Sequence, residues 1–371
     1  MHRYNQAALI QLMSNGILNR ELFIRFSLLA LSLLLVFVGG EFVCRLFFPD
    51  TQLRYTTDSE SLYYLEPNQV GMMSVANGTR FIPARINNFG FRGPDIKEGS
   101  QPLILVLGDS FTLGAGVQDH ETFSALLDTW LGSKGVVVNG GQPGYGTFQM
   151  AATLQRVGDR LRPQLVVVVL WQGDFMRQPL DSVAREEFFA KKRRLEILKT
   201  SVLLTHIYRR VERALLHFGA DRFVLRLGEG GMNAGLNSVA IVDTYLRGLE
   251  ADLPRLAAMH QQATRYGDGI FLVLWPKEDF ATQAEEGLAD LLTNRLGTFA
   301  REHKIPFISV QPAMRQWPPS FLLIPNDWHP TALAHCLAAK RIAAELMTYG
   351  LHITKPMMCH SVEPSPERPL S

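Results

Sequence analysis

Runs of consecutive apolar residues recur along the chain after residue 100, and each ends in small or polar residues. The clearest is Leu103–Leu107, which stops at Gly108-Asp109-Ser110. A strand that is apolar at every position suits the centre of a parallel sheet, because helices cover both of its faces. The runs that follow are predicted to be the remaining strands of this sheet: Val136–Asn139, Leu165–Leu170, Gly269–Leu274 and Phe307–Val310.

Between these runs, apolar residues recur at the three- and four-residue spacing of a helix face. Strands that alternate with helices are joined by right-handed crossovers, which place helices on both faces of a parallel sheet. Residues 101–350 are therefore predicted to form an α/β domain of three α/β/α layers around a five-stranded, doubly wound parallel sheet. The predicted helices are Glu121–Leu131, Phe148–Leu161, Glu286–Glu302 and Leu333–Tyr349.

The first 48 residues carry a longer apolar run. Phe26–Gly40 has no charged residue, and the run continues to Phe48 across only Glu41 and Arg45. About 20 apolar residues span a bilayer, so a transmembrane helix is predicted over residues 26–48. A cleaved signal peptide and a buried soluble helix are the alternatives, but no small-x-small cleavage site follows the run convincingly.

The arginines before this run set the expected orientation. Arg3, Arg20 and Arg25 favour an N-terminus (residues 1–25) in the cytoplasm. The helix is then an uncleaved signal anchor in the cytoplasmic membrane, crossing it once. Everything after Pro49 would lie outside the cytoplasm, in the periplasm if the cell is Gram-negative.

Three further segments fall outside the strand–helix alternation. Residues 49–100 are rich in Tyr, Thr, Asn, Gly and Pro, which predicts an irregular or β-rich lead-in. Residues 176–240 are an insertion in which Arg185–His217 is predicted to be helical. Its basic cluster, Lys191–Arg194, is read as a solvated helix face, with a lid or a contact to anionic glycan or lipid headgroups as alternatives. Residues 351–371 are expected to be disordered.

Composition narrows the classes of protein that the chain can represent. A formal net charge of +2, without a basic stripe interleaved with aromatic residues, argues against nucleic-acid binding. Cys44, Cys336 and Cys359 lie far apart, so neither a disulfide framework nor a metal site is expected from them. A nucleotide-binding protein would need a glycine-rich loop directly after the first strand, and Gly114-Ala-Gly116 is too short for that role.

The candidate chemistry lies where strands end. Ser110 follows the first strand, and ligands of open α/β sheets bind beyond the carboxyl ends of the strands. A serine attacks only when a base removes its proton, and the base needs an orienting partner. Asn326-Asp-Trp-His-Pro330 supplies His329 as the base and Asp327 as its partner just before the last helix, whereas His335 is expected to be structural.

A third requirement is a set of donors for the oxyanion of the reaction. The segment from Asn139 to Thr147 follows the second strand and is rich in glycine. Glycines let the backbone approach a ligand closely and present its N–H groups. This loop is therefore expected to reach the same sheet edge as Ser110.

Together these residues resemble the SGNH hydrolases, the GDSL-type esterases and lipases. Gly108-Asp-Ser-Phe111 is similar to the nucleophile block of that family, Asn139-x-x-x-Pro-Gly-Tyr-Gly-Thr147 to its glycine block, and Asp327-Trp-His-Pro330 to its acid–histidine block. The resemblance implies a flavodoxin-like SGNH sheet. It also implies that the backbone N–H groups of Ser110 and Gly144 hold the oxyanion. Residues beside these blocks are expected to contact substrate: Asp109, Trp171 and Asp174.

The chain departs from the family in two places. Many members have the acid three residues before the histidine, where this chain has Asn326, but Asp327 at two residues before also occurs within the family pattern.

The other departure lies in the block where the family carries an asparagine that completes the oxyanion hole. Here this chain reads Leu170-Trp-Gln-Gly-Asp-Phe175. Aligning Asp174 puts Gly173 where the asparagine belongs. Gln172, one residue earlier, is therefore the candidate donor in that region.

The sequence thus predicts a membrane-anchored, extracytoplasmic serine esterase that needs no metal or organic cofactor. By analogy with the family, its expected substrates are O-acyl groups on cell-envelope carbohydrate, or lipid esters. Two alternatives stay open. One is an O-acyltransferase that uses the same site, and the other is a non-catalytic glycan-binding or assembly protein of the same fold. The sequence does not indicate an oligomeric state.

Overall fold

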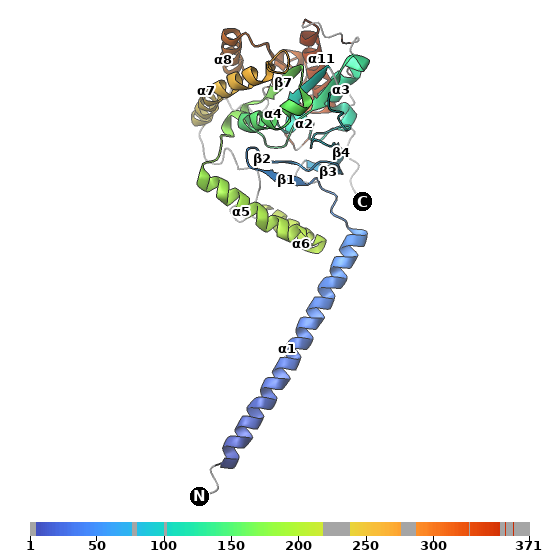
Figure 1. Ribbon diagram of the computed structural model, residues 1–371, viewed down its shortest axis with the longest axis vertical. Helices are drawn as coiled ribbons and strands as arrows, with labels where there is room; N and C mark the ends of the chain where they lie inside the picture. The colour runs from blue at the N-terminus through green and yellow to red at the C-terminus, as the bar shows by residue number, and fades with distance from the viewer. Residues whose placement is uncertain are drawn as a thin grey trace. The chain divides into compact units, whose positions relative to one another are not determined.

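The computed structural model describes residues 5–75, 80–99, 102–217, 238–275, 287–325, 327–348, 353 and 359. The chain divides into two compact units, which are described separately. One consists of Met1–Asp50 and Ala190–Leu225, and the other of Thr51–Phe189 and Arg226–Ser371. The second unit contains the α/β body (Figure 1).

The body is built on a parallel sheet of five strands in the order β6-β5-β7-β8-β9. The residues of β5, β7 and β8 are buried along their whole length, as expected for strands between two helical layers. The five strands predicted from the apolar runs are confirmed, with ends that differ by at most one residue. They are β5 Leu103–Leu107, β6 Val136–Asn139, β7 Leu165–Leu170, β8 Ile270–Leu274 and β9 Phe307–Ser309.

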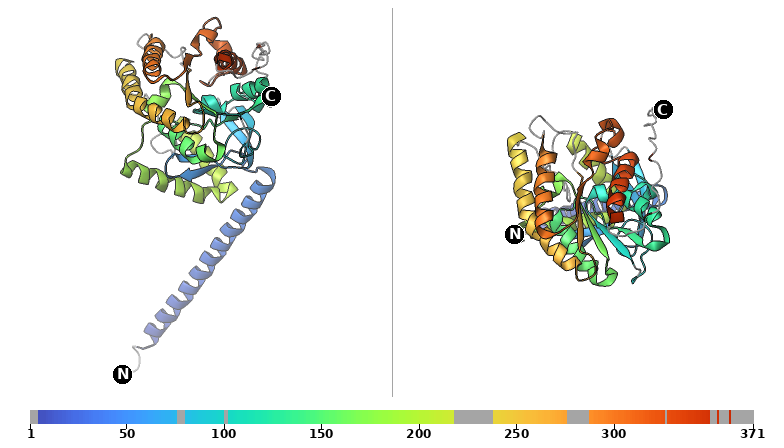
Figure 2. Two further views of the ribbon diagram at one scale, coloured as in Figure 1. Left: turned by 45° about the horizontal axis from the view of Figure 1, so that its top comes forward. Right: turned by 90° about the horizontal axis from the view of Figure 1, so that it is seen from above.

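Helices cover both faces of this sheet, as Figure 2 shows in its view from above. Leu103, Leu105 and Leu107 of β5 enter the core beneath one helical layer, while Ile104 and Val106 enter the opposite core. The predicted three-layer, doubly wound architecture is therefore confirmed. The first layer consists of α4 Thr147–Leu161, α7 Ser238–Ala263 and α8 Leu288–His303, and the second of α3 Phe123–Leu131 and α11 Ala332–Thr348.

The helix α7 is not among the elements predicted from the sequence. Its residues Tyr245, Leu249, Leu253 and Leu256 are buried at helical spacing, so the pattern is present. Pro254 lies inside the helix, where a proline removes a backbone hydrogen bond and argues against a helix. Packing of the apolar face against the sheet offsets that cost.

The region from 176 to 217 differs from the single helical stretch expected over Arg185–His217. It forms two helices, α5 Ser182–Lys199 and α6 Val202–His217. The break occurs because Ser201 starts a new helix, with its hydroxyl accepting the Leu204 N–H at 3.1 Å. The part of the insertion from 218 to 237 lies outside the described residues.

Two antiparallel hairpins precede the sheet. One pairs β1 Tyr55–Asp58 with β2 Leu62–Leu65, and the other pairs β3 Gln69–Val75 with β4 Arg80–Ile86. Short helical turns complete the body: α2 Ser110–Leu113, η2 Asp119–Glu121, η3 Gly132–Lys134, η4 Gln172–Met176, α9 Gln311–Met314 and α10 Pro319–Leu322.

The other unit contains the long helix α1, Asn5–Phe47. Its segment Leu22–Phe47 has a mean hydropathy of 2.4 and is long and apolar enough to cross a membrane. Large apolar side chains are exposed along it, including Phe23, Leu35 and Phe47. A signal sequence near an N-terminus meets the same criterion of length and hydropathy.

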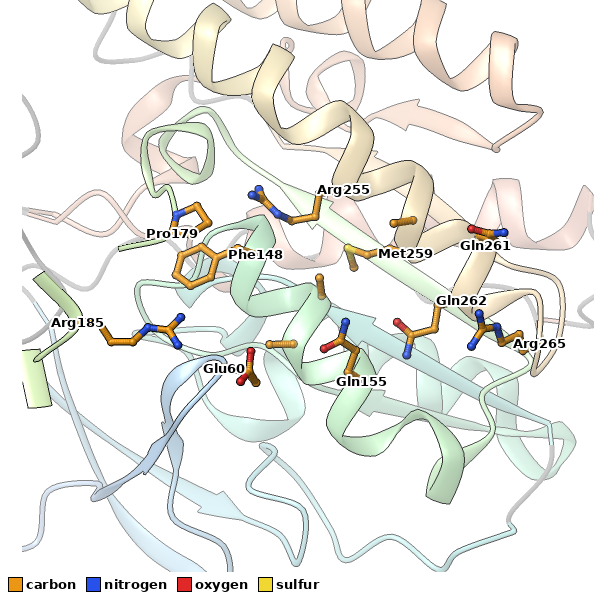
Figure 3. A pocket seen from close by; sticks show the side chains of 13 residues that line it. Glu60, Phe148, Gln155, Pro179, Arg185, Arg255, Met259, Gln261, Gln262 and Arg265 are labelled. Atoms are coloured by element: carbon orange, nitrogen blue, oxygen red, sulfur yellow. The ribbon is translucent and has the colours of Figure 1, made fainter. Parts of the chain in front are cut away.

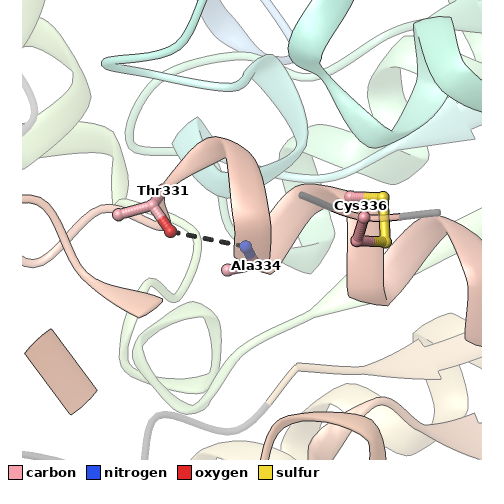
Figure 4. Close-up of a disulfide and its surroundings, with 4 residues drawn as sticks. Thr331, Ala334 and Cys336 are labelled. Carbon is pink, nitrogen blue, oxygen red and sulfur yellow. Dashed lines mark hydrogen bonds between the residues drawn. A yellow bond between two sulfur atoms is a disulfide. The ribbon is translucent and has the colours of Figure 1, made fainter. Parts of the chain in front are cut away.

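Cys336 of α11 forms a disulfide with Cys359, which lies 23 residues later in the sequence (Figure 4). The expectation that the cysteines form no disulfide is therefore wrong for this pair, because sequence spacing does not reveal that the chain returns to α11. Cys44 is the free cysteine of the described residues. Most of the tail predicted to be disordered, 351–371, lies outside the described residues.

We expect Cys359→Ser to lower the free energy of unfolding of the body by about 3 kcal/mol, the scale for a cross-link that closes a loop of this length. Thermal unfolding without reductant measures the effect, and Cys44→Ser is the matched control because that cysteine is free. Equal midpoints for the two variants would show that the disulfide contributes no stability.

Candidate active site

The predicted site residues gather at the carboxyl edge of the sheet. Ser110 begins α2 three residues after the end of β5, and Gln172 begins η4 two residues after the end of β7. The chain passes from β5 to β6 on one side and then crosses to β7 on the other. This reversal makes the β5–β7 boundary the switch point of the sheet, which is where doubly wound folds hold their ligands.

Ser110, His329 and Asp327 form one hydrogen-bonded line. The Ser110 Oγ lies 3.0 Å from Nε2 of His329, and Nδ1 of His329 lies 2.6 Å from Oδ1 of Asp327. Both distances are within hydrogen-bond reach for a nucleophile, a base and an orienting carboxylate. The structure thus brings together three residues that sequence reasoning placed in two separate blocks.

A tight turn fixes Asp327 and His329 relative to each other. Oδ1 of Asp327 also accepts the backbone N–H of His329 at 2.9 Å. The ends of the turn are tied by the Ile324 N–H, which donates to the His329 carbonyl at 3.0 Å. An aspartate only two residues before the histidine can therefore orient the imidazole ring, and no residue distant in the sequence is needed for this role.

Aromatic rings shield the line from water. The ring of Trp328 stacks on His329 with centroids 4.7 Å apart, and Trp171 packs on Trp328 at 5.2 Å. Phe111, the residue after the nucleophile, stacks on Trp171 at 5.2 Å. Ser110 is 6% exposed and His329 9% exposed, so hydrogen bonds between them act in surroundings of low dielectric constant.

Asp109, the residue before Ser110, belongs to a buried ionic cluster with Asp174 and Arg177. Nη1 of Arg177 lies 3.2 Å from Oδ2 of Asp109 and 2.9 Å from Oδ1 of Asp174, and it donates to the Tyr145 carbonyl at 2.8 Å. The other carboxylate oxygens accept backbone N–H groups, from Phe111 at 2.8 Å and Trp171 at 3.1 Å. One guanidinium thus links the nucleophile turn, the glycine-rich loop and the end of β7.

The pKa values of Asp174 and Arg177 are both raised, which favours a neutral carboxyl group and a charged guanidinium. Burial raises the pKa of Asp174 well above its usual range, and the nearby charge of Asp109 raises it further. Burial alone would lower the pKa of Arg177, but the two carboxylates outweigh it and raise that pKa. Both carboxylates, which were predicted to contact substrate, have hydrogen-bond partners inside the protein.

The glycine-rich loop is held against the nucleophile turn at close range. The Gln142 N–H donates to the Gly108 carbonyl at 3.1 Å. A β-carbon at Gly141 would collide with the backbone of Leu113, so only glycine allows this approach. Gly144, the predicted oxyanion donor, has φ +71° and requires the left-handed conformation that glycine adopts freely.

Gly173 stands at the position where the resemblance predicts an asparagine, and the structure shows what fills that space. A β-carbon at Gly173 would collide with the indole ring of Trp171. Nε1 of Trp171 is buried and has no hydrogen-bond partner among the described residues. Gln172, the predicted donor, is 8% exposed beside this ring.

Arg92 supports the nucleophile turn and is missed by sequence reasoning. Its buried guanidinium donates to the carbonyls of Leu113, Gly114 and Val117, and Nε pairs with Asp119 at 2.6 Å. These carbonyls belong to the end of α2 and the loop behind it. The sequence signal is only the Phe91-Arg-Gly93 turn, which does not show that the side chain reaches residues 21 to 25 positions away.

His335 also lies in the body and acts as a neutral core residue. Burial lowers its pKa to about 3, and the positive charge of Arg92 lowers it further. Its ring stacks on Phe123, and Nδ1 accepts the Phe123 N–H at 3.3 Å. The structure thus gives His335 packing contacts rather than a place beside Ser110.

Acid is expected to destabilise the body through His335. The unfolded histidine takes up a proton near pH 6.5 while the folded one stays neutral to about pH 3. Stability therefore falls as pH decreases from about 6.5 towards 3. Urea unfolding at pH 7.5 and pH 5 measures this loss, and His335→Gln should show a smaller loss than wild type. An equal loss in both proteins would exclude His335 as the source.

A separate groove of about 570 Å³ lies along α4 and α7 (Figure 3). Phe148 and Pro179 mark one end, and Gln261 and Arg265 mark the other. None of Ser110, His329 and Asp327 lines it. Its other labelled lining residues are Glu60, Gln155, Arg185, Arg255, Met259 and Gln262.

Within the described ranges, no group of three or more His, Cys, Asp or Glu side chains could hold a metal ion. The chemistry that the described site can perform with its own residues is nucleophilic attack by a serine with a histidine as general base.

Comparison with known proteins gives a consistent family. The model of the GDSL-like lipase/acylhydrolase family matches residues 106–337. No curated protein matches the chain. The similar solved structures include LAE5, an alpha/beta hydrolase from the metagenome of Lake Arreo, Spain, at 16% identity and a TM-score of 0.39, covering 70% of this chain and 99% of that one.

Two other similar structures are of enzymes named after a substrate class. Phospholipase A1 from Streptomyces albidoflavus NA297 is 15% identical with a TM-score of 0.39, and the match covers 66% of this chain and 98% of that one. A catalytic mutant of Axe2, an acetylxylan esterase from Geobacillus stearothermophilus, is 16% identical with a TM-score of 0.39, covering 68% and 96%.

Proposed function

Because this chain belongs to the GDSL-like lipase/acylhydrolase family, which makes it a hydrolase of ester bonds, we propose that Ser110 is its nucleophile. The observation that carries the proposal is the hydrogen-bonded line from Ser110 through His329 to Asp327. That line holds a hydroxyl, a base and an orienting carboxylate in the order that acyl transfer requires.

In the proposed mechanism, Oγ of Ser110 attacks the ester carbonyl while Nε2 of His329 takes the hydroxyl proton. The carbonyl oxygen becomes an oxyanion, which accepts the N–H groups of Ser110 and Gly144. The tetrahedral intermediate collapses to an acyl-enzyme as His329 returns the proton to the leaving alcohol. His329 then deprotonates a water that attacks the acyl carbon. As the second tetrahedral intermediate collapses, the bond from Ser110 Oγ to the acyl carbon breaks, His329 returns the proton to Oγ, and the acid is released.

We assign Asp327 the role of holding the imidazole in its tautomer and stabilising the imidazolium. Trp171 is the remaining predicted substrate contact, because it lines the site with Phe111 and Trp328. Asp109 and Asp174 act in this proposal through Arg177, which positions the loop that carries Gly144.

The proposed substrate is an O-acyl group on cell-envelope carbohydrate. The groove along α4 supports carbohydrate over lipid, because three amide and three guanidinium side chains line it beside apolar ones, a mixture that suits the hydroxyl groups and ring faces of a sugar. Phe148 lines the groove four residues after Gly144, so the groove begins close in sequence to the proposed oxyanion loop.

We propose that α1 anchors the chain in the cytoplasmic membrane with the body on the far side. Its segment Leu22–Phe47 supports the anchor. The disulfide between Cys336 and Cys359 supports an oxidising compartment, because structural disulfides are rare in the cytosol.

The rate at which the full-length protein, in a glycoside detergent, hydrolyses p-nitrophenyl acetate and butyrate tests the proposed esterase activity. A fluorophosphonate probe should label wild type and not Ser110→Ala. Transfer of the acyl group to an added glycan in preference to water would instead identify an O-acyltransferase. No hydrolysis, no transfer and no labelling would leave a non-catalytic glycan-binding protein as the interpretation.

Gln172→Ala is expected to lower kcat by about a hundredfold if the Gln172 amide is the third oxyanion donor. Gln164→Ala is the matched control, since Gln164 lies at the opposite end of β7 and bonds Asp268. Trp171→Phe keeps an aromatic ring and removes the unpartnered N–H. A large loss in Trp171→Phe with none in Gln172→Ala would transfer the donor role to the indole.

A further inference from the structure

The helix α6 is attached at several points to the end of α1. Glu41 of α1 accepts the Ser201 hydroxyl at 2.7 Å and the backbone N–H groups of Val202 and Leu203 at 3.0 and 2.9 Å. A carboxylate inside an otherwise apolar segment therefore binds the N-terminus of α6, where backbone N–H groups and the helix dipole favour negative charge.

Three further contacts extend this attachment to Arg45 of α1 and to the residues just after the helix. Nη2 of Arg45 donates to the Thr200 carbonyl at 2.8 Å, and Nε2 of His206 lies 2.7 Å from the Phe48 carbonyl. Arg209 forms a bidentate pair with Asp50 at 2.9 and 3.1 Å. The start of α6 is thus fixed at the level where the apolar segment of α1 ends.

The free face of α6 is apolar. At 100° per residue, Leu204, Ile207, Val211 and Leu215 fall within an arc of about 80°. Ile207 is 49% exposed and Val211 51% exposed, which is unusual for large aliphatic side chains of one helix face. Large apolar side chains are also exposed at the end of α1 and just after it: Phe42, Leu46, Phe47 and Phe48.

Positive charge borders the apolar face. Arg210 is exposed on α6, next to Val211. Exposed basic side chains also occur in the last part of α5 within the same unit: Lys191, Arg193 and Arg194. An amphipathic helix with cationic side chains beside its apolar face is the pattern of a helix that lies in the headgroup layer of an anionic membrane.

We propose that α6 lies in the interfacial layer of the bilayer that α1 crosses, with Ile207 and Val211 in the acyl boundary and Arg210 at anionic headgroups. The inference rests on the proposed membrane anchor. The partner of the apolar face of α6 is a phospholipid surface, because the contacts of Glu41, Arg45 and His206 hold α6 at the end of the apolar segment of α1. The unit then attaches to the membrane by two elements rather than one.

Site-directed spin labelling of the full-length chain tests this arrangement. The Cys44→Ala background leaves the disulfide intact and allows single cysteines at Ile207, Val211 and Arg210, reconstituted in vesicles of phosphatidylcholine and phosphatidylglycerol. The ratio of accessibility to oxygen over accessibility to an aqueous nickel chelate reports depth. Leu33 of α1 is the lipid reference, and exposed Val70 of β3 is the aqueous reference.

We expect ratios at Ile207 and Val211 to exceed the Val70 ratio several-fold, with Arg210 between the two references. Ratios at Ile207 and Val211 equal to that of Val70, with Leu33 in lipid, would overturn the inference and leave the anchor intact. An aqueous ratio at Leu33 would overturn the anchor itself. The Ile207 and Val211 ratios should fall in vesicles of phosphatidylcholine alone, and unchanged ratios there would overturn the anionic-headgroup assignment.

Discussion

Ser110→Ala should lower the turnover of p-nitrophenyl esters by at least about a thousandfold, since the acyl-enzyme cannot form without the serine oxygen. His329→Ala should cause a loss of similar size, because His329 Nε2 lies 3.0 Å from the Ser110 hydroxyl that it is proposed to deprotonate. Initial rates of full-length protein in detergent measure both variants.

The double variant gives the sharper result. Residues that act as one unit lose their contributions together, so Ser110→Ala with His329→Ala should be no slower than either single variant. His335→Gln is the matched histidine control, because His335 is packed against Phe123 and should leave the rate nearly unchanged. Multiplied losses in the double variant would mean that Ser110 and His329 act independently, contrary to the proposed mechanism.

Arg177→Met is expected to lower the free energy of unfolding by about 3–5 kcal/mol, the scale for removing one partner of a buried ion pair. Arg177 is the basic side chain beside the buried carboxylates of Asp109 and Asp174. Turnover should fall as well, because the Tyr145 carbonyl loses the donor that holds the loop carrying Gly144. Urea unfolding and initial rates measure the two effects.

Two further variants test whether the loss of stability in Arg177→Met comes from a buried charge left without a partner. Arg160→Met removes an exposed pair with Glu98 and should change stability little, because exposed ion pairs contribute little. Adding Asp174→Asn to Arg177→Met should restore part of the lost stability, since one uncompensated charge is removed. If Asp174→Asn restores nothing, the buried charge is not the cause of the loss.

The fold class could be predicted from the sequence because its signals are local. Each buried strand, such as β5 or β7, is apolar at every residue, and this follows from burial on both faces. The doubly wound order follows from alternation with helices. The helix α7 was missed for an equally local reason, because Pro254 lies in its middle.

The nucleophile and the acid–histidine turn could be predicted for the same reason, since each is a short motif beside a predicted element, Ser110 after β5 and Asp327-Trp-His329 before α11. Asp327 and His329 are two residues apart, so one turn sets their contact. Their roles in catalysis stay predictions, as does the donor role of Gln172.

Only the tertiary structure shows the contacts between residues that are far apart in the sequence. Arg177 pairs with Asp109 across 68 residues, Arg92 reaches Val117 across 25, and Cys336 bonds Cys359 across 23. The choice of partner for a buried charge or a thiol depends on which chain segments the sheet brings together at one edge. The hydrophobic periodicity of the sequence does not predict that partner, because it depends only on neighbouring residues and not on which distant segment an arginine or a cysteine contacts after folding.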